Sequence, residues 1–205
     1  MIACGANDEI RMTNDEFCRV VRRSERRYNA AFTLIELIVV TTVIIILTGL
    51  VLSTVGYIQK KGARTRAETE IAAMSAACES YKADNGIYPA GSATNTLDAR
   101  TYLDPSDSAY SAASLFLYER LMGVTTGNRS ETPSGKTYFT FKPNMLLPAP
   151  PSSADVTGIR DPFGNSYGYS TIQAATGDST KGYNPTFDLW STANSTDPNQ
   201  WVKNW

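Results

Sequence analysis

Histidine is absent from this chain of 205 residues, and cysteine occurs only three times. Without an imidazole, neither a Ser-His-Asp triad nor a Cys-His pair can form, and the common zinc sites lose their nitrogen ligand. The cysteines, Cys4, Cys18 and Cys78, form no C-x-x-C pair that would indicate a zinc or redox motif. Because most of the usual enzyme machinery is missing, we expect the protein not to be an enzyme.

An excess of charge of either sign is also missing. The chain has 19 Lys and Arg residues against 20 Asp and Glu residues, for a formal net charge of -1. Proteins that bind nucleic acid use positive side chains to neutralise phosphates, and that contact supplies much of their affinity. We therefore expect no nucleic-acid partner. The length of the chain allows one modest domain and an anchor.

One long hydrophobic run is present. Residues 32–55 read FTLIELIVVTTVIIILTGLVLSTV, which is about as long as the roughly 20 residues that cross a bilayer as a helix. Glu36 is the only ionisable residue in this run. An acidic side chain costs about 2.5 to 3.5 kcal/mol at mid-membrane and less near the interface, so Glu36 indicates a functional role with a partner. The alternative is a tolerated interfacial acid in an ordinary anchor.

The segment before this run, residues 1–31, is polar and rich in arginine toward its end, with Arg19, Arg22, Arg23, Arg26 and Arg27. It predicts a leader. A secretory signal peptide is the alternative, but its apolar region usually spans only about 7 to 15 residues before a cleavage site. The basic flank predicts a cytoplasmic N-terminus. Four cations beyond the run weaken that prediction, namely Lys60, Lys61, Arg64 and Arg66.

A second helical pattern follows the apolar run. Apolar residues recur at spacings of four, three, four and three positions, at Ala67, Ile71, Met74, Cys78 and Tyr81. This spacing predicts one apolar helix face, and Asn85-Gly86 supplies the stop signal. We expect one helix over residues 32–84, membrane-spanning to residue 55 and amphipathic from residue 56. Part of its apolar face is expected to pack on the rest of the chain and the remainder on neighbouring copies.

Residues 85–205 are rich in Gly, Pro, Ser, Thr and Tyr and predict a loop-rich head. We predict a helix over residues 111–122, which Gly123 ends. Strands are predicted over residues 137–141, 167–172 and 187–191. The segment LPAPPSS, residues 147–153, predicts an irregular surface connection. The expected fold class is α+β, with a long N-terminal helix packed on a small C-terminal head that contains a short antiparallel sheet.

Two further groups of residues have ordinary structural interpretations. The tryptophans are interpreted as core and edge packing and not as a ligand platform, namely Trp190, Trp201 and Trp205. Three acids fall in predicted loops and are interpreted as solvated or turn-forming, namely Asp155, Asp161 and Asp178.

The junction AFTLIELIVV, residues 31–40, resembles the class III signal of type IV pilins and type II secretion pseudopilins. In that pattern a basic leader and a small residue precede Phe-Thr-Leu-Ile-Glu, which opens a long hydrophobic helix. The resemblance implies cleavage between Ala31 and Phe32 by prepilin peptidase and N-methylation of Phe32. It also implies that the Glu36 carboxylate pairs with the amino terminus of a neighbouring subunit. The family favours Gly where Ala31 stands, which implies slower cleavage, and the long leader leaves Met12 as an alternative start.

Three head motifs are similar to those of the major pseudopilin of type II secretion, namely YKADNGIYP at 81–89, DPFGNSYGY at 161–169 and FDLWS at 187–191. They imply a pilin-like fold and a structural subunit that polymerises from the bacterial inner membrane into a periplasmic pseudopilus that drives protein export. The implied partners are copies of itself, other pseudopilins, prepilin peptidase, the inner-membrane assembly platform and membrane lipid. The insertions at 91–110 and 123–153 leave a minor or divergent member open.

The same resemblance implies a calcium ion, because major pseudopilins commonly bind one in the loop after the last strand. Calcium prefers hard oxygen ligands, and the candidates here are Asp188, Asn194 and Asp197. Their positions depart from the family's usual loop.

Two other functions stay open. The first is a type IV pilin of an extracellular fibre, acting in adhesion, motility or DNA uptake. Such pilins commonly close a C-terminal loop with a disulfide, but cleavage would leave Cys78 as the only cysteine here. The second is a single-pass anchor that presents a binding head without polymerising and does not depend on Glu36.

Overall fold

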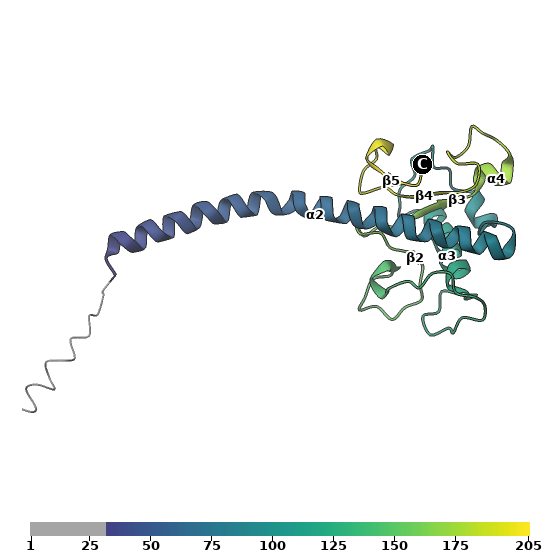
Figure 1. Ribbon diagram of the computed structural model, residues 1–205, viewed down its shortest axis with the longest axis horizontal. Coiled ribbons are helices and arrows are strands. Elements are labelled where there is room, and N and C mark those ends of the chain that lie inside the picture. Colours follow the sequence, from purple (N-terminus) through teal and green to yellow (C-terminus); the bar gives the residue numbers. More distant parts are fainter. Residues whose placement is uncertain (1–31) are drawn as a thin grey trace, which may run out of the picture. The chain divides into compact units, whose positions relative to one another are not determined.

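The computed structural model describes residues 32–205 (Figure 1). The predicted leader at 1–31, with the cleavage residue Ala31, lies outside the described residues. The chain divides into two compact units, Met1–Ser53 and Thr54–Trp205, and each is described separately.

Helix α2 covers Leu34–Asn85, a length of 52 residues, which confirms the helix expected over 32–84. Thr33 caps its start, because the Thr33 Oγ1 accepts a hydrogen bond from the backbone N–H of Glu36 at 3.2 Å. Gly86 ends it with φ +78°, and the Gly86 N–H donates to the Lys82 carbonyl at 2.7 Å. A glycine in this left-handed conformation is the common helix stop.

In the first unit, the side chains of residues 32–53 are all exposed. The hydroxyls within this apolar part of α2 bond back to backbone carbonyls three or four residues earlier, as at Thr42 (to Ile38, 2.8 Å) and Thr48 (to Ile44, 2.7 Å). Such bonds satisfy hydroxyl groups where water is absent. Within residues 32–205, α2 is the one helix long and apolar enough to cross a membrane.

In the second unit, the predicted apolar stripe of α2 packs into the core. Ala67, Ile71, Met74 and Cys78 are buried, and Tyr81 is partly buried against the same cluster. The expectation that part of this stripe stays free for neighbouring copies is therefore wrong, because the chain's own head covers it. Between Ala67 and Tyr81, the side chains that α2 leaves exposed are small or polar, including Ala72, Ala73 and Ala76.

Helix α3, Ser108–Met122, begins three residues earlier than predicted. The Asp107 side chain accepts a hydrogen bond from the Ala109 N–H at 2.8 Å and so supplies the cap. Gly123 ends the helix with φ +78°, as predicted. The buried residues Leu117 and Leu121 belong to the same core cluster as the stripe of α2.

Two small antiparallel sheets complete the C-terminal unit, which confirms the α+β class. One pairs β1 with β2, and the other has the order β3-β4-β5. In the view of Figure 1, β3 to β5 lie on one side of the C-terminal half of α2, and α3 and β2 on the other. The bounds are β1 Leu146–Leu147, β2 Gly158–Ile159, β3 Gly168–Ser170, β4 Asp188–Ser191 and β5 Val202–Lys203. Three shorter 3-10 turns and the five-residue helix α4, Ile172–Thr176, fill the connections.

The predicted strands have three different outcomes. The strand over 187–191 is confirmed as β4, and the strand over 167–172 is shortened to β3 because the chain turns into α4 after Thr171. The strand over 137–141 is wrong. Its Tyr138 and Phe139 N–H groups both donate to the Leu121 carbonyl, at 2.8 and 3.1 Å, so this segment closes the end of α3.

The tryptophans pack as predicted. Trp190 and Trp201 are buried, with parallel rings whose centroids lie 6.2 Å apart, and Trp205 is partly buried beside Trp190. The Trp190 indole lies over Gly168 of the neighbouring strand, where an added Cβ would come within 2.3 Å of the ring. Only glycine fits at that position of β3.

The insertion at 123–153 is held by two charged side chains. The Arg129 guanidinium donates to the carbonyls of Ala154 and Pro148, both at 2.6 Å, and so fixes the proline-rich segment. That segment is irregular as predicted, apart from Leu147, which pairs with Gly158. The exposed Glu131 carboxylate accepts hydrogen bonds from the backbone and hydroxyl groups of Thr125 and Thr126.

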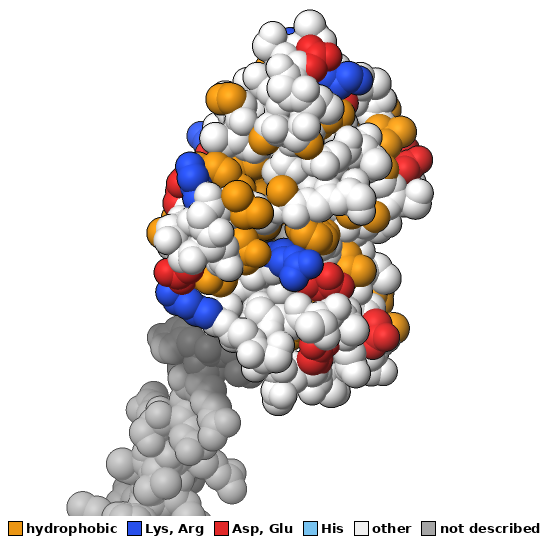
Figure 2. Space-filling view, turned by 90° about the vertical axis from the view of Figure 1, so that its right-hand side faces the viewer, with side chains coloured by type: hydrophobic (Ala, Val, Ile, Leu, Met, Phe, Trp, Pro, Cys, Tyr) orange, Lys and Arg blue, Asp and Glu red, His pale blue; other side chains and the backbone are white. Residues whose placement is uncertain are grey.

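The face of the molecule at the end of α2 is partly apolar. Figure 2 shows hydrophobic side chains around a positive and a negative side chain on this face. Near the helix end, Lys136 and Asp84 form an ion pair at 2.5 Å, and Ile87 is 63% exposed. An open hollow of about 380 Å³ next to Ile87 is lined mainly by apolar residues, including Tyr88, Ala90, Ala174 and Pro185.

Met74→Ala should lower the free energy of unfolding by about 2 to 5 kcal/mol, because it leaves a cavity at a fully buried position. Denaturant titration, followed by the fluorescence of the buried tryptophans, measures this change. Ala76→Ser on the exposed face is the control and should change stability by less than about 0.5 kcal/mol. Equal effects of the two substitutions would contradict the packing of the stripe.

The Glu131 loop should be sensitive to acid. The hydrogen bonds from Thr126 and Thr125 lower the pKa of the Glu131 carboxyl from 4.5 to about 2. Since the folded-state pKa is the lower one, the stabilisation is present above about pH 4.5 and is lost as the pH falls toward 2. Titration of the side-chain carboxyl carbon by NMR measures this value directly. Glu131→Gln should abolish this low-pH loss of stability, and titration near 4.5 in the parent chain would refute the arrangement.

Candidate functional site

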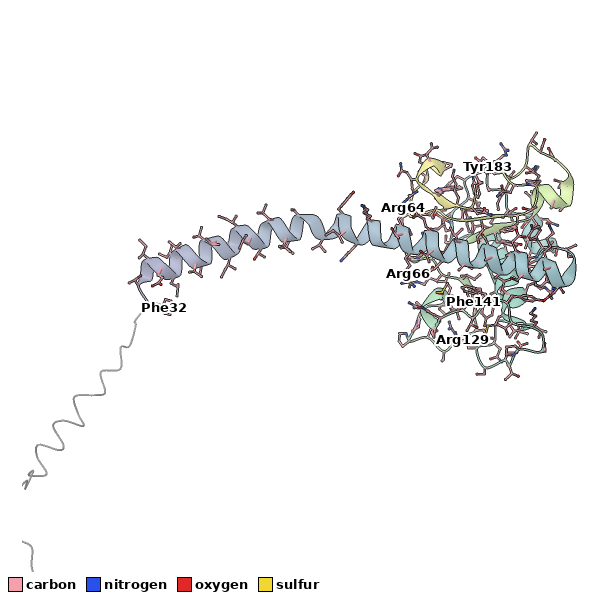
Figure 3. The ribbon with its side chains drawn as sticks, in the orientation of Figure 1. Phe32, Arg64, Arg66, Arg129, Phe141 and Tyr183 are labelled. Carbon is pink, nitrogen blue, oxygen red and sulfur yellow. The ribbon has the colours of Figure 1, made fainter. Side chains whose placement is uncertain are left out.

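The first turn of α2 is the candidate site, because it carries the isolated acid of the apolar run. Phe32 lies just before the helix, as Figure 3 shows, and its side chain is 77% exposed. Phe32 and Thr33 are outside the helix, so the chain enters this site in a non-helical conformation. Ala31, the other residue of the predicted cleavage bond, lies outside the described part of the chain.

Glu36 occupies the third helical position after the Thr33 cap. The sequence Thr-Leu-Ile-Glu is therefore a capping-box pattern, in which the acid sits among the free N–H groups of the first turn. The positive end of the helix dipole stabilises a carboxylate there by about 0.3 to 1 kcal/mol. That is less than the roughly 2.5 to 3.5 kcal/mol that the charge costs at mid-membrane. The helix dipole alone would therefore not offset the free-energy cost of burying the Glu36 charge at mid-membrane.

No cation of the described chain pairs with Glu36. Its carboxylate takes part in no ion pair among residues 32–205. Lys60, the next basic residue along the chain, is 24 positions later in the same helix, which corresponds to about 36 Å of helix. A charge that neutralises Glu36 must therefore come from the N-terminal side of Phe32 or from another molecule.

The three candidate calcium ligands have separate hydrogen-bond partners. The Asp188 carboxylate accepts from the Tyr183 and Asn184 N–H groups, both at 2.9 Å. The Asn194 Oδ1 accepts from the Asn165 side-chain amide at 2.6 Å. The Asp197 side chain caps a 3-10 turn through the Asn199 N–H at 2.9 Å.

This arrangement does not fit one calcium ion held by all three residues. Asp188 begins β4, whereas Asn194 and Asp197 follow its other end, and the strand itself extends about 10 Å from Asp188 to Ser191. Residues 32–205 contain no group of three or more His, Cys, Asp or Glu side chains that could hold a metal.

Asp161 is turn-forming, as one of its two sequence interpretations has it, but the sequence does not reveal its burial. It is 1% exposed and not solvated. Its carboxylate accepts from the N–H groups of Phe163 (3.0 Å) and Asn165 (2.8 Å) and from the hydroxyl of Ser191, so protein donors replace water. Burial raises the pKa of Asp161, and these hydrogen bonds offset part of the rise. The Asp-Pro-Phe-Gly pattern signals the turn, but the contact with Ser191 depends on the fold.

The Asp161 turn and the loop after β4 are joined by two contacts. One is the Ser191 hydroxyl bond to Asp161, and the other is the amide bond between Asn165 and Asn194. The two motif segments at 161–169 and 187–191 therefore meet in space. Asp155 and Asp178 are exposed, and the Asp178 side chain accepts from Thr180 within a turn, as predicted.

Calcium should leave the thermal stability of the protein unchanged. Melting of the full chain is compared in excess calcium and in EDTA, with Asp197→Asn as a control variant. A folded-state site filled at about 100 times its dissociation constant would add about 2.7 kcal/mol, which raises Tm by several degrees. A rise of that size in the parent chain, absent in Asp197→Asn, would establish a site that the described hydrogen bonds do not favour.

No protein-family model, no curated protein and no solved structure matches the chain.

Proposed function

We propose that the chain is a structural subunit of a type II secretion pseudopilus. In this proposal prepilin peptidase processes the subunit in the bacterial inner membrane, and the subunit then polymerises with its head in the periplasm to drive protein export. The observation that carries the proposal is the Phe-Thr-Leu-Ile-Glu junction, with Glu36 isolated in the first turn of an exposed apolar helix.

The exposed apolar part of α2 requires a cover. Its large hydrophobic side chains between Leu34 and Val55 are roughly 40 to 75% exposed. A large contiguous apolar surface on a protein marks a site of interaction with a membrane or with another protein. A helix that is hydrophobic all round is covered by lipid or by other helices. A pseudopilin uses both covers in turn, lipid before assembly and neighbouring helices in the filament.

Cleavage would create the missing partner of Glu36. Before cleavage the Phe32 nitrogen is an uncharged amide, and afterwards it is an ammonium whose charge N-methylation preserves. A desolvated carboxylate is strongly stabilised by an opposite charge within hydrogen-bonding distance. Processing would thus permit assembly, because the new Phe32 ammonium of one subunit would neutralise the Glu36 carboxylate of another.

The head motifs have structural roles that support the proposal. Asn85-Gly86 terminates α2, Asp161 organises a buried turn, and the segment at 187–191 forms the central strand β4. Motif residues that build the fold are those a family of structural subunits would share. The proposal includes no catalytic step.

A type IV pilin of an extracellular fibre is the second candidate. The same junction and the same exposed helix favour this candidate. The C-terminal disulfide common in such pilins is missing from residues 32–205, because their only cysteine is the buried Cys78. Burial raises the pKa of the Cys78 thiol to about 12. Deletion of the gene distinguishes the two. Loss of protein secretion supports a pseudopilin, whereas loss of surface fibres supports a pilin.

Glu36→Gln and Glu36→Ala should each lower the entry of subunits into filaments by at least about 30-fold. Removing one partner of a desolvated charge pair costs about 2 to 5 kcal/mol. The Gln variant keeps the Thr-x-x-Gln capping pattern, so its loss would report the charge and not the helix start. Filament mass after shearing or crosslinking, relative to membrane-bound subunit, is the measurement.

Glu68→Ala is the matched control, because Glu68 is an exposed acid of the same helix with only an exposed ion pair to Arg64. It should assemble normally. Mass spectrometry of all variants should find N-methylated Phe32 as the first residue. Normal assembly of Glu36→Gln would refute the role of the Glu36 charge in assembly, absence of filaments from the parent chain would favour a single-pass anchor, and a different N-terminus would refute the cleavage site.

A further inference from the structure

The residues that follow the apolar run carry a concentration of positive charge. Between Glu36 and Glu68 the chain has no acidic residue, and it has four cations, namely Lys60, Lys61, Arg64 and Arg66. They occupy about two turns of α2, directly after the exposed residues Tyr57 and Ile58. The head provides partners for only two of the four.

Arg64 is bound by the C-terminal segment of the chain. Its guanidinium donates to the Gln200 carbonyl at 2.7 Å and to the Trp201 carbonyl at 3.3 Å, and it lies 3.4 Å from the Glu68 carboxylate. Figure 3 shows Arg64 at the edge of the head. This side chain joins α2 to the segment before β5.

Arg66 is also engaged within the head. Its Nε lies 2.7 Å from the Glu70 carboxylate, whose other oxygen accepts a hydrogen bond from the Tyr167 hydroxyl at 2.8 Å. Glu70 is largely buried, with an 11% exposed side chain, so Arg66 neutralises a charge that the fold removes from water. The pair joins α2 to the residue before β3.

Lys60 and Lys61 differ from these arginines. Both are exposed, and neither has an ion pair or a side-chain hydrogen bond within the described chain. Lys61 lines a shallow hollow of about 650 Å³ together with Tyr57 and Ile58. An apolar and aromatic surface that ends in two free ammonium groups matches the boundary between acyl chains and headgroups, where tyrosine and lysine side chains concentrate.

We propose that Lys60 and Lys61 bind the phosphates of anionic phospholipids in the leaflet next to the head. The two ammonium groups supply the complementary charge, and Tyr57 and Ile58 supply the apolar contact below it. This inference rests on the membrane-anchoring part of the proposed function. It explains why cations follow the apolar run on the side where the positive-inside rule disfavours them: Arg64 and Arg66 bind groups of the chain itself, and Lys60 and Lys61 bind lipid.

The test uses the full chain reconstituted in phosphatidylcholine vesicles that contain phosphatidylglycerol. Electron paramagnetic resonance of spin-labelled lipids measures how strongly the protein selects phosphatidylglycerol over phosphatidylcholine. Each lysine is expected to contribute about five-fold to binding of an anionic headgroup, so Lys60→Gln/Lys61→Gln should lose about 30-fold at this site. The leader arginines are identical in all variants and cancel in the comparison.

Two controls separate this site from general charge. Lys142→Gln/Lys181→Gln removes two exposed lysines of the head and should retain the selection. Lys60→Arg/Lys61→Arg keeps both charges and should retain it as well. High salt should weaken the selection by the parent chain, because salt screens exposed charges.

The outcomes distinguish the inference from the proposal on which it depends. Alkaline carbonate extraction first establishes whether each variant is inserted in the vesicles. A parent chain that does not insert would overturn the membrane anchor and this inference with it. Insertion with equal phosphatidylglycerol selection by the parent and the Lys60→Gln/Lys61→Gln variant would overturn this inference alone.

Discussion

The charge of Glu36 is the constraint on which the proposed function of the chain depends. The first turn of α2 gives it about 0.3 to 1 kcal/mol, which is too little to offset mid-membrane burial. The described chain offers no cation within reach, and the nearest one in α2 is about 36 Å away along the helix. A protein that keeps this acid must either hold it near the membrane interface or provide a positive partner from the N-terminal side of Phe32 or from another molecule.

The packing of the head determines which surfaces remain for such a partner. The apolar stripe of α2 is covered by α3 and the sheets of the same chain, so the second half of the helix has no large apolar surface left. The exposed hydrophobic side chains of α2 lie in its first half, from Leu34 to Ile58. In the proposed function, association of subunits would bury mainly the segment that lipid would cover before assembly, so one apolar cover would replace another.

The sequence predicts the long helix well and the head only in part. Local signals define α2 and α3, because the apolar spacing and the glycines Gly86 and Gly123 act within a few residues. The burial of Asp161 needs Ser191, and the role of Arg64 needs Gln200, which is 136 positions away. Strands of two residues, such as β5, are too short for a period of two to appear. The aromatic segment at 137–141 has the composition of a strand but caps α3.

In the proposed function, the two charged positions that bracket the apolar run would set its place in a bilayer. Glu36 and Lys60 are about 36 Å apart along the helix, and the hydrocarbon core is about 30 Å thick. With the lysines at one headgroup layer, Glu36 lies at the opposite interface, where its charge costs little. Movement of the subunit toward the head side would draw Glu36 into the hydrocarbon. In the proposed function, the amine created by cleavage would be needed at that step, and an unprocessed subunit would remain in the membrane and not assemble.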